Sequence, residues 1–532
     1  MIEFWAKTTS DGFPGISVFK HLVNTGCVAR CLAEASSFLI ERFQFRAAEL
    51  GALVALHDLG KISPGFQGKS EQWLIVNNLA TVAKNGNWLG GTETDHGKVS
   101  HAVIQDFLIE AGWPRSAVKY LAAVLGAHHG RIKFPPNDRG IRPPLIASLS
   151  EERSGIDWQS ERLQCARKVW DYFGINEVPV NLIGHDPVIW WLAGLTTVAD
   201  WIGSDERFFS PADGNDSDPE ACAKEAISVI GLVPPTIVPG LTFEQLFGFS
   251  SNDMQRKAMA TITGSGVYVI EAPMGMGKTE AALGAAYQLL AAGQACGIYF
   301  ALPTQATSNR IHLRMCEFLN RIAPASGASR LVHSNSWLMN SFSDEYNPAR
   351  NATEKTGQDA RSGRDWFASA RRALLTPFGV GTVDQALLGV VAAKHFFVRR
   401  FALAGKVVII DEVHSYDVYT GTLVDMLIKT LEDLGCTIII LSATLTGKRR
   451  TQILANPKNS ITPETISYPL LTGRTEQTPF SPVSATPPAS KKIIVEFVKP
   501  ETALDAAITV ASAGGAIWTC NNKMDTSRSH NF

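Results

Sequence analysis

The spacing of apolar residues changes near residue 245, and this change constrains the fold more than any other feature of the sequence. From about residue 17 to residue 203, apolar residues recur every three or four positions, which is the period of an amphipathic helix. Beyond residue 246 they form short runs such as VYVI, KVVII and TIIIL, each followed by a helical stretch. Strands buried under helices on both faces of a parallel sheet have this pattern. We therefore expect a multidomain protein, with an all-helical domain followed by an α/β domain.

Polar and Pro-rich stretches mark the expected boundaries, because 532 residues exceed what one hydrophobic core usually organises. A polar segment within the α/β domain, residues 334–372, predicts an inserted surface segment. A further strand, KKIIVEFV, and a helix, ETALDAAITVASAG, predict that another lobe begins near the end of the chain. The expected parts are a helical domain over 1–225, a connector over 226–245, an α/β lobe over 246–472, a linker over 473–490 and the start of a second lobe over 491–532.

Composition excludes several classes of protein. The formal net charge of −1 argues against a protein held on nucleic acid by a uniformly basic surface. The eight cysteines form no CxxC pair, so we expect reduced thiols in the core, including Cys27 and Cys31 on one predicted helix. No apolar run reaches the roughly 18 residues that span a bilayer, and the N-terminus does not resemble a signal peptide. We expect a cytoplasmic protein with no membrane association.

The predicted helical domain is rich in histidine and aspartate. A hydrolytic two-metal site needs imidazoles and carboxylates that converge, with one carboxylate able to bridge the ions. A single histidine on an amphipathic helix is more often a hydrogen-bonded core or surface residue, and HDLGK could be only a polar helix end before Gly60. The combination within one domain favours a metal site. The candidates are His21, His57, Asp58, His96, His128, His129 and Asp200.

Two further histidines are weaker candidates. His185 precedes Asp186 and repeats the dipeptide, but Pro187 follows, which indicates a loop or a first helical turn. His101 lies near His96 and is a fallback ligand if His96 points elsewhere.

The segment EAPMGMGKTE, residues 271–280, has the context of a phosphate-binding loop between a strand and a helix. Glycines allow the backbone to wrap an anion, and the helix N-terminus adds partial positive charge. Lys278 would contact the β and γ phosphates of ATP and Thr279 would hold Mg²⁺. Gly275 and Gly277 would shape the loop, in which Ala272 replaces the first glycine of the strict pattern.

Two further motifs follow on successive strand ends. In DEVH, Asp411 would bind Mg²⁺ and Glu412 would orient the water that attacks the γ-phosphate. SAT, formed by Ser442, Ala443 and Thr444, ends the next strand. Each motif alone is common, and their order on successive strands favours an ATPase.

The helical domain resembles the HD phosphohydrolase superfamily, and in particular the HD nuclease domain of the CRISPR-associated helicase-nuclease of type I interference systems. The resemblance rests on FWAK, HDLGK, DHGKVS, AHHG and ADWIGS in this order. It implies one ion held by His21, His57, Asp58 and Asp200, and a second, bridged by Asp58, held by His96, His128 and His129. It also implies divalent transition metals of the Mn, Ni, Co or Fe class. Lys61 matches a lysine that could steady a phosphate, so Asp58 and Lys61 are expected catalytic residues together with Glu412 of the ATP site.

The α/β domain resembles the first RecA-like lobe of superfamily 2 helicases, with motifs I, II and III in EAPMGMGKTE, DEVH and SAT. ALPTQATSNRI and GTVDQALL resemble motifs Ia and Ib, and Gln255 occupies the place of an adenine-reading glutamine. Ser442, Ala443 and Thr444 are expected to couple ATP hydrolysis to movement. The expected DNA contacts are Thr304, Gln305, Asn309, Thr382 and Gln385.

The resemblance implies a metal-dependent deoxyribonuclease that cuts single-stranded DNA, joined to an ATP-driven translocase and recruited by a Cascade-type effector complex with its guide RNA in antiviral defence. The sequence contains no QRxGRxxR-like motif of a second lobe, and KMDTSRSHNF departs from the family pattern. We therefore expect a C-terminally truncated chain with impaired ATP hydrolysis. Two alternatives remain: an inactive nucleotide-binding or DNA-binding remnant or adaptor, and an HD phosphohydrolase of small nucleotides. A fused helicase lobe argues against the second.

Overall fold

The computed structural model divides the chain into two units, Met1–Thr486 and Pro487–Phe532. Within the expected helix of the second unit, positions 505, 508, 509 and 512 are described as helical. The expected strand KKIIVEFV and the predicted insert 334–372 lie outside the described residues. The structure describes residues 2–81, 95–130, 154–175, 186–213, 216–303, 305–324, 331–333, 373–391, 393–413, 418–454, 468–475, 481–488, 505, 508, 509 and 512.

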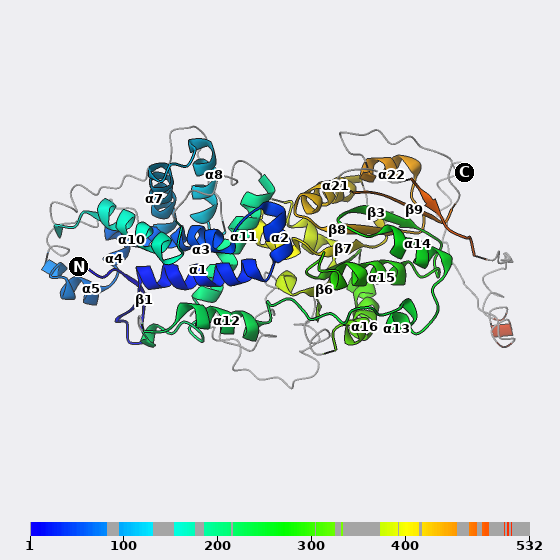
Figure 1. The fold of residues 1–532 in the computed structure, drawn as a ribbon, viewed down its shortest axis with the longest axis horizontal. Coiled ribbons are helices and arrows are strands. Elements are labelled where there is room, and N and C mark those ends of the chain that lie inside the picture. The colour runs from blue at the N-terminus through cyan, green and yellow to red at the C-terminus, as the bar shows by residue number, and fades with distance from the viewer. Residues whose placement is uncertain are drawn as a thin grey trace. The chain divides into compact units, whose positions relative to one another are not determined.

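The first part of the chain is mainly helical, as expected (Figure 1). Helix α1 (Val18–Glu34) is central and is buried along most of its length against α3, α11 and α12. Cys27 and Cys31 lie in its buried face, in accord with the expected core thiols. The other helices are α2 (Ser37–Phe43), α3 (Ala47–Ala55), η1 (Leu56–Lys61), α4 (Pro64–Gln67), α5 (Glu71–Val76), α7 (His96–Glu110), α8 (Arg115–Leu125), α10 (Trp158–Tyr172), α11 (Asp186–Gly203), η2 (Pro211–Asp213) and α12 (Pro219–Ile230).

Two glycines allow α1 and α3 to pack with their backbones in close approach. A Cβ atom built on Gly26 would lie 2.8 Å from the carbonyl oxygen of Gly51, and one built on Gly51 would lie 2.9 Å from that of Gly26. Real Cβ atoms do not approach backbone oxygen this closely, so larger residues would push the helices apart. This contact matters for the site, because α1 carries His21 and α3 leads directly into His57.

The expectation of an all-helical first domain is wrong at the N-terminus, where β1 (Trp5–Thr8) and β2 (Pro14–Ser17) form an antiparallel hairpin. Strands of four residues give little periodic signal. Tertiary contacts stabilise them: the Trp5 backbone amide donates to Gln67 Oε1 at 3.1 Å, and the Trp5 indole donates to the Gln67 carbonyl at 3.1 Å.

The α/β domain contains an eight-stranded sheet in the order β10-β9-β3-β8-β7-β4-β6-β5. The strands from β3 to β8 are parallel, as expected, and β9 pairs antiparallel with β3 and with β10. The bounds are β3 (Gly266–Glu271), β4 (Ile298–Leu302), β5 (Leu331–His333), β6 (Phe378–Thr382), β7 (Val407–Ile410), β8 (Thr437–Ser442), β9 (Leu470–Thr475) and β10 (Val483–Ser484).

Helices cover both faces of this sheet (Figure 1). Alternate residues of β8 illustrate the two faces: Ile439 and Leu441 belong to the core under α15 and α16, whereas Ile438 and Ile440 belong to the core under α21. The helices of this domain are α13 (Phe243–Phe247), α14 (Asp253–Thr261), α15 (Lys278–Ala291), α16 (Gln305–Ile322), η5 (Ala373–Leu375), α19 (Val383–Leu387), α20 (Phe396–Leu403), α21 (Val418–Asp433) and α22 (Gly447–Leu454).

Regular structure extends into both predicted connectors. Helix α12 runs to Ile230, and α13 begins at Phe243, so residues 231–242 form the connecting segment. Strand β9 runs to Thr475, and β10 lies within the predicted linker 473–490. These strands form because the edge of β3 pairs with β9, a contact that the Pro/Thr/Ser-rich composition of the linker does not indicate. No helix among the described residues is long and apolar enough to cross a membrane.

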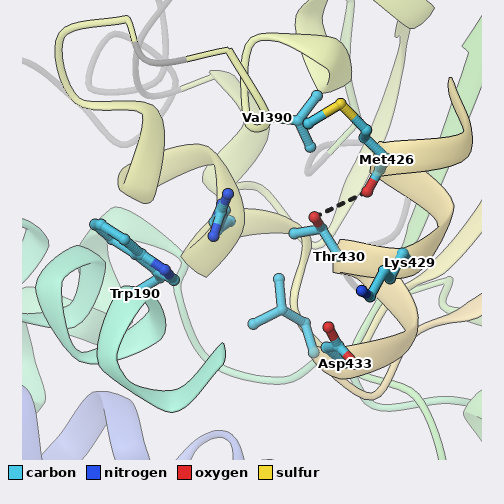
Figure 2. A pocket seen from close by; sticks show the side chains of 8 residues that line it. Trp190, Val390, Met426, Lys429, Thr430 and Asp433 are labelled. Atoms are coloured by element: carbon cyan, nitrogen blue, oxygen red, sulfur yellow. Dashed lines mark hydrogen bonds between the residues drawn. The ribbon is translucent and has the colours of Figure 1, made fainter. Parts of the chain in front are cut away.

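The helical and α/β parts meet where α11 packs against α20. A Cβ atom on Gly194 would lie 2.3 Å from Phe401 Cβ, so glycine is required for this close packing. An open pocket of about 360 Å³ lies beside this contact. Figure 2 shows Trp190 of α11 on one side of it and Met426, Thr430 and Asp433 of α21 on the other. One continuous hydrophobic core therefore extends from the helical domain to one face of the sheet.

Candidate metal centre and nucleotide pocket

The seven predicted metal ligands come from five separate segments and meet in the helical domain. They form two groups, in each of which the possible ligand atoms lie within 4.8 Å of one another. The first group takes His21 from α1, His57 and Asp58 from η1, and Asp200 from α11. The second takes His96 from the first residue of α7, and His128 and His129 from the turn after α8.

The first group surrounds one oxygen of Asp58. Asp58 Oδ2 lies 3.1 Å from His21 Nε2 and 3.3 Å from His57 Nε2. Asp200 Oδ1 lies 3.8 Å from His21 Nε2 and 3.5 Å from His57 Nε2. Two carboxylates and two imidazoles therefore face one small volume.

The other oxygen of Asp58 faces the second group. Asp58 Oδ1 lies 3.3 Å from His96 Nε2 and 3.3 Å from His128 Nε2. His129 Nε2 lies 2.9 Å from His96 Nε2. Asp58 thus has the position of a carboxylate that can bridge two cations.

The local backbone explains how Asp58 reaches both groups. Asp58 has a non-helical conformation within η1, at φ −114° and ψ 18°. Gly60 lets η1 lie directly on α7, because a Cβ atom there would be 2.1 Å from the carbonyl oxygen of His96. The Gly60 amide donates to Ser100 Oγ at 2.9 Å, which assigns a structural role to the serine of the DHGKVS motif. Gly60 is therefore more than a helix stop.

Backbone carbonyls orient the imidazoles toward the centre. His57 Nδ1 lies 3.0 Å from the Val54 carbonyl, and His128 Nδ1 lies 3.5 Å from the Leu125 carbonyl. Protonated Nδ1 atoms that donate to these carbonyls leave the Nε2 lone pairs directed inward. Within the described residues, the buried atoms His57 Nε2, His128 Nε2 and Asp58 Oδ1 make no hydrogen bond. Buried polar atoms without partners are costly, and cations would satisfy them, so the donor set fits two ions.

Burial and the two carboxylates give the ligands different protonation states. Burial lowers the pKa of His21 and of His128 to about 3, and that of His96 to about 4. Burial also opposes a proton on His57, but Asp58 and Asp200 outweigh it and raise the pKa of His57 to about 9.

The carboxylates stay ionised despite their burial. Burial raises the pKa of Asp58, but Lys61 and His57 more than offset burial and hold this pKa well below its usual value. Burial also raises the pKa of Asp200, but His57 outweighs burial and lowers this pKa. Ionised carboxylates and neutral imidazoles are the forms that bind metals.

Lys61 lies at the centre, with Nζ 2.8 Å from Asp58 Oδ2 and the side chain largely buried. Two residues near the centre were not predicted. Ser204 Oγ donates to Asp200 Oδ1 at 3.1 Å, and Thr197 Oγ1 donates to the His128 carbonyl at 3.3 Å. Asp200 and Ser204 are four residues apart, and this spacing could have indicated the contact between them.

The weaker histidine candidates are outside both groups. His101 is buried on α7 and belongs to neither group among the described residues. Helix α11 begins at Asp186, so Pro187 lies in its first turn, as predicted, and His185 lies outside the described residues.

The predicted phosphate loop lies at the carboxyl end of β3, beside an open pocket of about 440 Å³. Gly275 and Gly277 have φ angles of 81° and 75°, which favour glycine. A Cβ atom on Gly277 would also lie 2.3 Å from Gln255 Nε2. Lys278 Nζ donates to the Ala272 carbonyl at 2.8 Å, and burial lowers the pKa of Lys278.

Other predicted nucleotide residues line the same pocket, among them Gln255, Thr279, Asp411 and Glu412. Gln255 Nε2 donates to the Gly277 carbonyl at 3.3 Å, so the glutamine contacts the loop directly. Asn252, which was not predicted, lines the pocket and donates to the Met276 carbonyl at 2.9 Å.

Asp411 and the SAT motif follow β7 and β8 at the same edge of the sheet. Glu412 has a left-handed backbone, with φ 53°, and its amide donates to Asp411 Oδ1 at 3.0 Å. Ser442 ends β8 beside the phosphate loop, because its carbonyl accepts from the Ala272 amide at 3.2 Å. Ser442 Oγ donates to the Thr444 carbonyl, and the Ala443 carbonyl accepts from Tyr468 Oη at 2.7 Å.

The predicted DNA contacts are only partly described. Thr382 is buried at the carboxyl end of β6 and precedes α19, which carries the half-buried Gln385. Gln305 and Asn309 are in α16, at the carboxyl edge of β4, and Thr304 lies outside the described residues. The described positions therefore share the edge of the sheet that carries the phosphate loop.

Family models match both domains: "Cas3, HD domain" matches residues 5–209, and "DEAD/DEAH box helicase" matches residues 252–453. The chain is 34% identical over 483 residues to the CRISPR-associated endonuclease/helicase Cas3 of Thermus thermophilus, covering 85% of this chain and 50% of that protein. It is 30% identical over 499 residues to the Escherichia coli protein of the same name, with coverages of 85% and 55%.

The fold is similar to the crystal structure of T. fusca Cas3-AMPPNP, with a TM-score of 0.74 and 25% identity over 97% of this chain and 61% of that chain. The chain spans about half the length of the curated relatives it matches. With a Cas3-type HD domain followed by a DEAD/DEAH box helicase domain, this chain belongs to the Cas3 family.

Proposed function

We propose that the chain is a metal-dependent nuclease of single-stranded DNA, coupled to an ATP-dependent superfamily 2 translocase, that acts in CRISPR antiviral interference. The observation that carries the nuclease proposal is the position of Asp58, which directs Oδ2 at one group of imidazoles and Oδ1 at the other.

Two divalent transition metal ions fit the five imidazoles and two carboxylates of the centre. Imidazole ligands suit the Ni, Co and Fe class, and the carboxylates also accept Mn. Such ions, when bound, lower the pKa of a coordinated water and stabilise charge on the attacking and leaving oxygens of a phosphodiester.

The residues of the chain prepare the site for that chemistry. Val54 and Leu125 carbonyls hold the rings of His57 and His128, and Ser204 holds Asp200. Lys61 Nζ lies 2.8 Å from Asp58 Oδ2. From this position the Lys61 ammonium would hold a DNA phosphate at the site through a charge-assisted hydrogen bond.

The pocket at β3 is proposed to bind ATP with Mg²⁺. Lys278 exchanges the Ala272 carbonyl for the β and γ phosphates, Thr279 and Asp411 hold Mg²⁺, and Glu412 orients the attacking water. Gln255 would read adenine, and Ser442, Ala443 and Thr444 would couple hydrolysis to movement. The T. fusca relative named with AMPPNP supports nucleotide binding at this fold.

The DNA strand is proposed to cross the carboxyl edge of the sheet and to contact the residues that resemble motifs Ia and Ib, which are Thr304, Gln305, Asn309, Thr382 and Gln385. A Cascade-type complex with guide RNA is the proposed partner, because the curated relatives are named as CRISPR-associated endonuclease/helicases. Slow ATP turnover by the 532-residue chain stays a prediction.

A cleavage assay with Asp58→Ala tests the proposal. The purified chain is incubated with Mn²⁺, Ni²⁺ or Co²⁺ and circular single-stranded DNA, and bound metal is counted. We expect Asp58→Ala to lose both ions and DNA cleavage, and Asp106→Ala, which changes an exposed carboxylate of α7, to keep both.

Two outcomes would favour the alternatives. Hydrolysis of a cyclic nucleotide in place of DNA would indicate a small-nucleotide phosphohydrolase. A wild-type chain that binds ATP but takes up no metal and cleaves neither substrate would indicate an adaptor or remnant.

A further inference from the structure

His395 belongs to the helicase domain, immediately before α20, yet it contacts two segments that carry metal ligands of the HD domain. Its backbone amide donates to the Gly130 carbonyl at 3.1 Å. Its ring centroid lies 5.7 Å from that of Trp201. Gly130 directly follows His129, and Trp201 directly follows Asp200.

The ring of His395 fits closely over Gly130. A Cβ atom built on Gly130 would lie 2.4 Å from His395 Cε1 and Nε2, so no other residue could occupy this position beside the ring. Gly130 also has φ 97°, which favours glycine. The Gly130 backbone therefore cannot shift toward His395 without a clash.

His395 has an unusual backbone conformation of its own. Its φ is 61°, and its side chain is only 5% exposed. A left-handed conformation costs a residue with a Cβ roughly 1–2 kcal/mol, so it persists only where the surroundings require it. Here the conformation brings the amide and the ring against Gly130 at once.

Helix α11 also contacts the turn that carries His128 and His129. Thr197 on α11 donates to the His128 carbonyl. Helix α20, which follows His395, packs against α11: the rings of Phe401 and Trp191 lie 5.7 Å apart between centroids. The helicase domain therefore contacts the turn directly through His395 and indirectly through α11.

We propose that His395 is a positioning residue for the second metal group, formed by His96, His128 and His129. The inference rests on the proposed two-metal nuclease. Ligating imidazoles must be held to within about 0.5 Å, and the removal of outer-shell support typically weakens metal binding by 10-fold to 100-fold. Loss of the His395 ring opens space beside Gly130, which lets the turn move and misaligns His128 and His129. The first group, built on α1, η1 and α11, is affected less.

The test is a calorimetric titration of the 532-residue chain with Mn²⁺, combined with thermal melting. For His395→Ala we expect the second ion to bind at least about tenfold more weakly, with the first ion within about threefold of the wild type. His395→Phe keeps a flat ring but no ligand nitrogen, so we expect nearly wild-type binding of both ions. This variant also separates positioning from direct ligation, because a metal ligand could not be replaced by phenylalanine.

Phe396→Ala is the matched control, because Phe396 lies at the same interface but faces Trp190. We expect it to bind both ions as the wild type does. The inference is overturned if His395→Ala binds both ions normally, if Phe396→Ala weakens the second ion equally, or if His395→Phe fails to restore it. If His395→Ala does not fold, His395→Leu takes its place, with the same expected and contrary results. A wild-type chain that does not bind two ions would instead refute the proposed function.

Discussion

A divalent cation that enters the first metal group has to displace a proton from His57. Burial opposes a proton on His57, but Asp58 Oδ2 and Asp200 Oδ1, which lie 3.3 and 3.5 Å from Nε2, outweigh burial and raise the pKa of His57 to about 9. At pH 7 this imidazole is therefore an imidazolium. An imidazole must be neutral to bind a metal, so loading the first group releases about one proton from His57.

His21, His128 and His96 release no proton at neutral pH. Burial holds the pKa values of His21 and His128 at about 3 and that of His96 at about 4, so these rings are already neutral. The affinity for the first ion should therefore rise about tenfold with each pH unit as long as the pH stays below 9. Between pH 6.5 and pH 8.0 the expected change is about 30-fold, or roughly 2 kcal/mol at 1.36 kcal/mol for each unit.

Titration calorimetry in two buffers of different ionisation enthalpy measures the released proton directly. At pH 7 the observed enthalpies should differ by about one buffer ionisation enthalpy for the first ion. Asp200→Asn removes one of the two carboxylates, so we expect weaker metal binding and a smaller proton release. Equal enthalpies in the two buffers, with an affinity that does not change from pH 6.5 to pH 8.0, would refute the reasoning.

Two further predictions test the helical domain and the α/β domain independently. Gly60→Ala places a Cβ atom 2.1 Å from the His96 carbonyl oxygen, so we expect a loss of about 3 kcal/mol in unfolding free energy and weaker binding of both ions, measured by urea unfolding and metal titration. Gly447→Ala, where nothing lies within 4 Å, should change stability by less than about 0.5 kcal/mol, and an equal effect of both changes would contradict the steric argument. Lys278→Ala should abolish binding of a fluorescent ATP analogue and leave metal binding unchanged; retained nucleotide binding would show that the pocket at β3 is not the ATP site.

The convergence of the candidate metal ligands could be predicted because their residue types are unusual in their surroundings. His57, Asp58 and Asp200 are ionisable groups within apolar helices, and buried charge needs a partner. The phosphate loop could be predicted because glycines after a buried strand have few other uses. In both cases the signal lies in short local motifs.

The remaining features depend on contacts between distant parts of the chain. Strand β9 is polar in part, and it forms because β3 offers it an edge. Nothing near Gly130 in the sequence indicates that His395 lies over it, since their proximity depends on how α11 and α20 pack. The periodicity of a segment reports which face is buried and gives no information about the partner that buries it.

The continuous core that joins α11 to α20 bears on how such a protein can be divided. The family models leave residues 210–251 between them, which suggests a place to separate the modules. A cut there would leave Trp191 on one fragment and Phe397 on the other. Both side chains are fully buried in the whole chain, and separation of the fragments would expose them to water. The helical and α/β parts thus share one buried interface along this face, and each covers apolar surface that the other would expose to water if the two were separated.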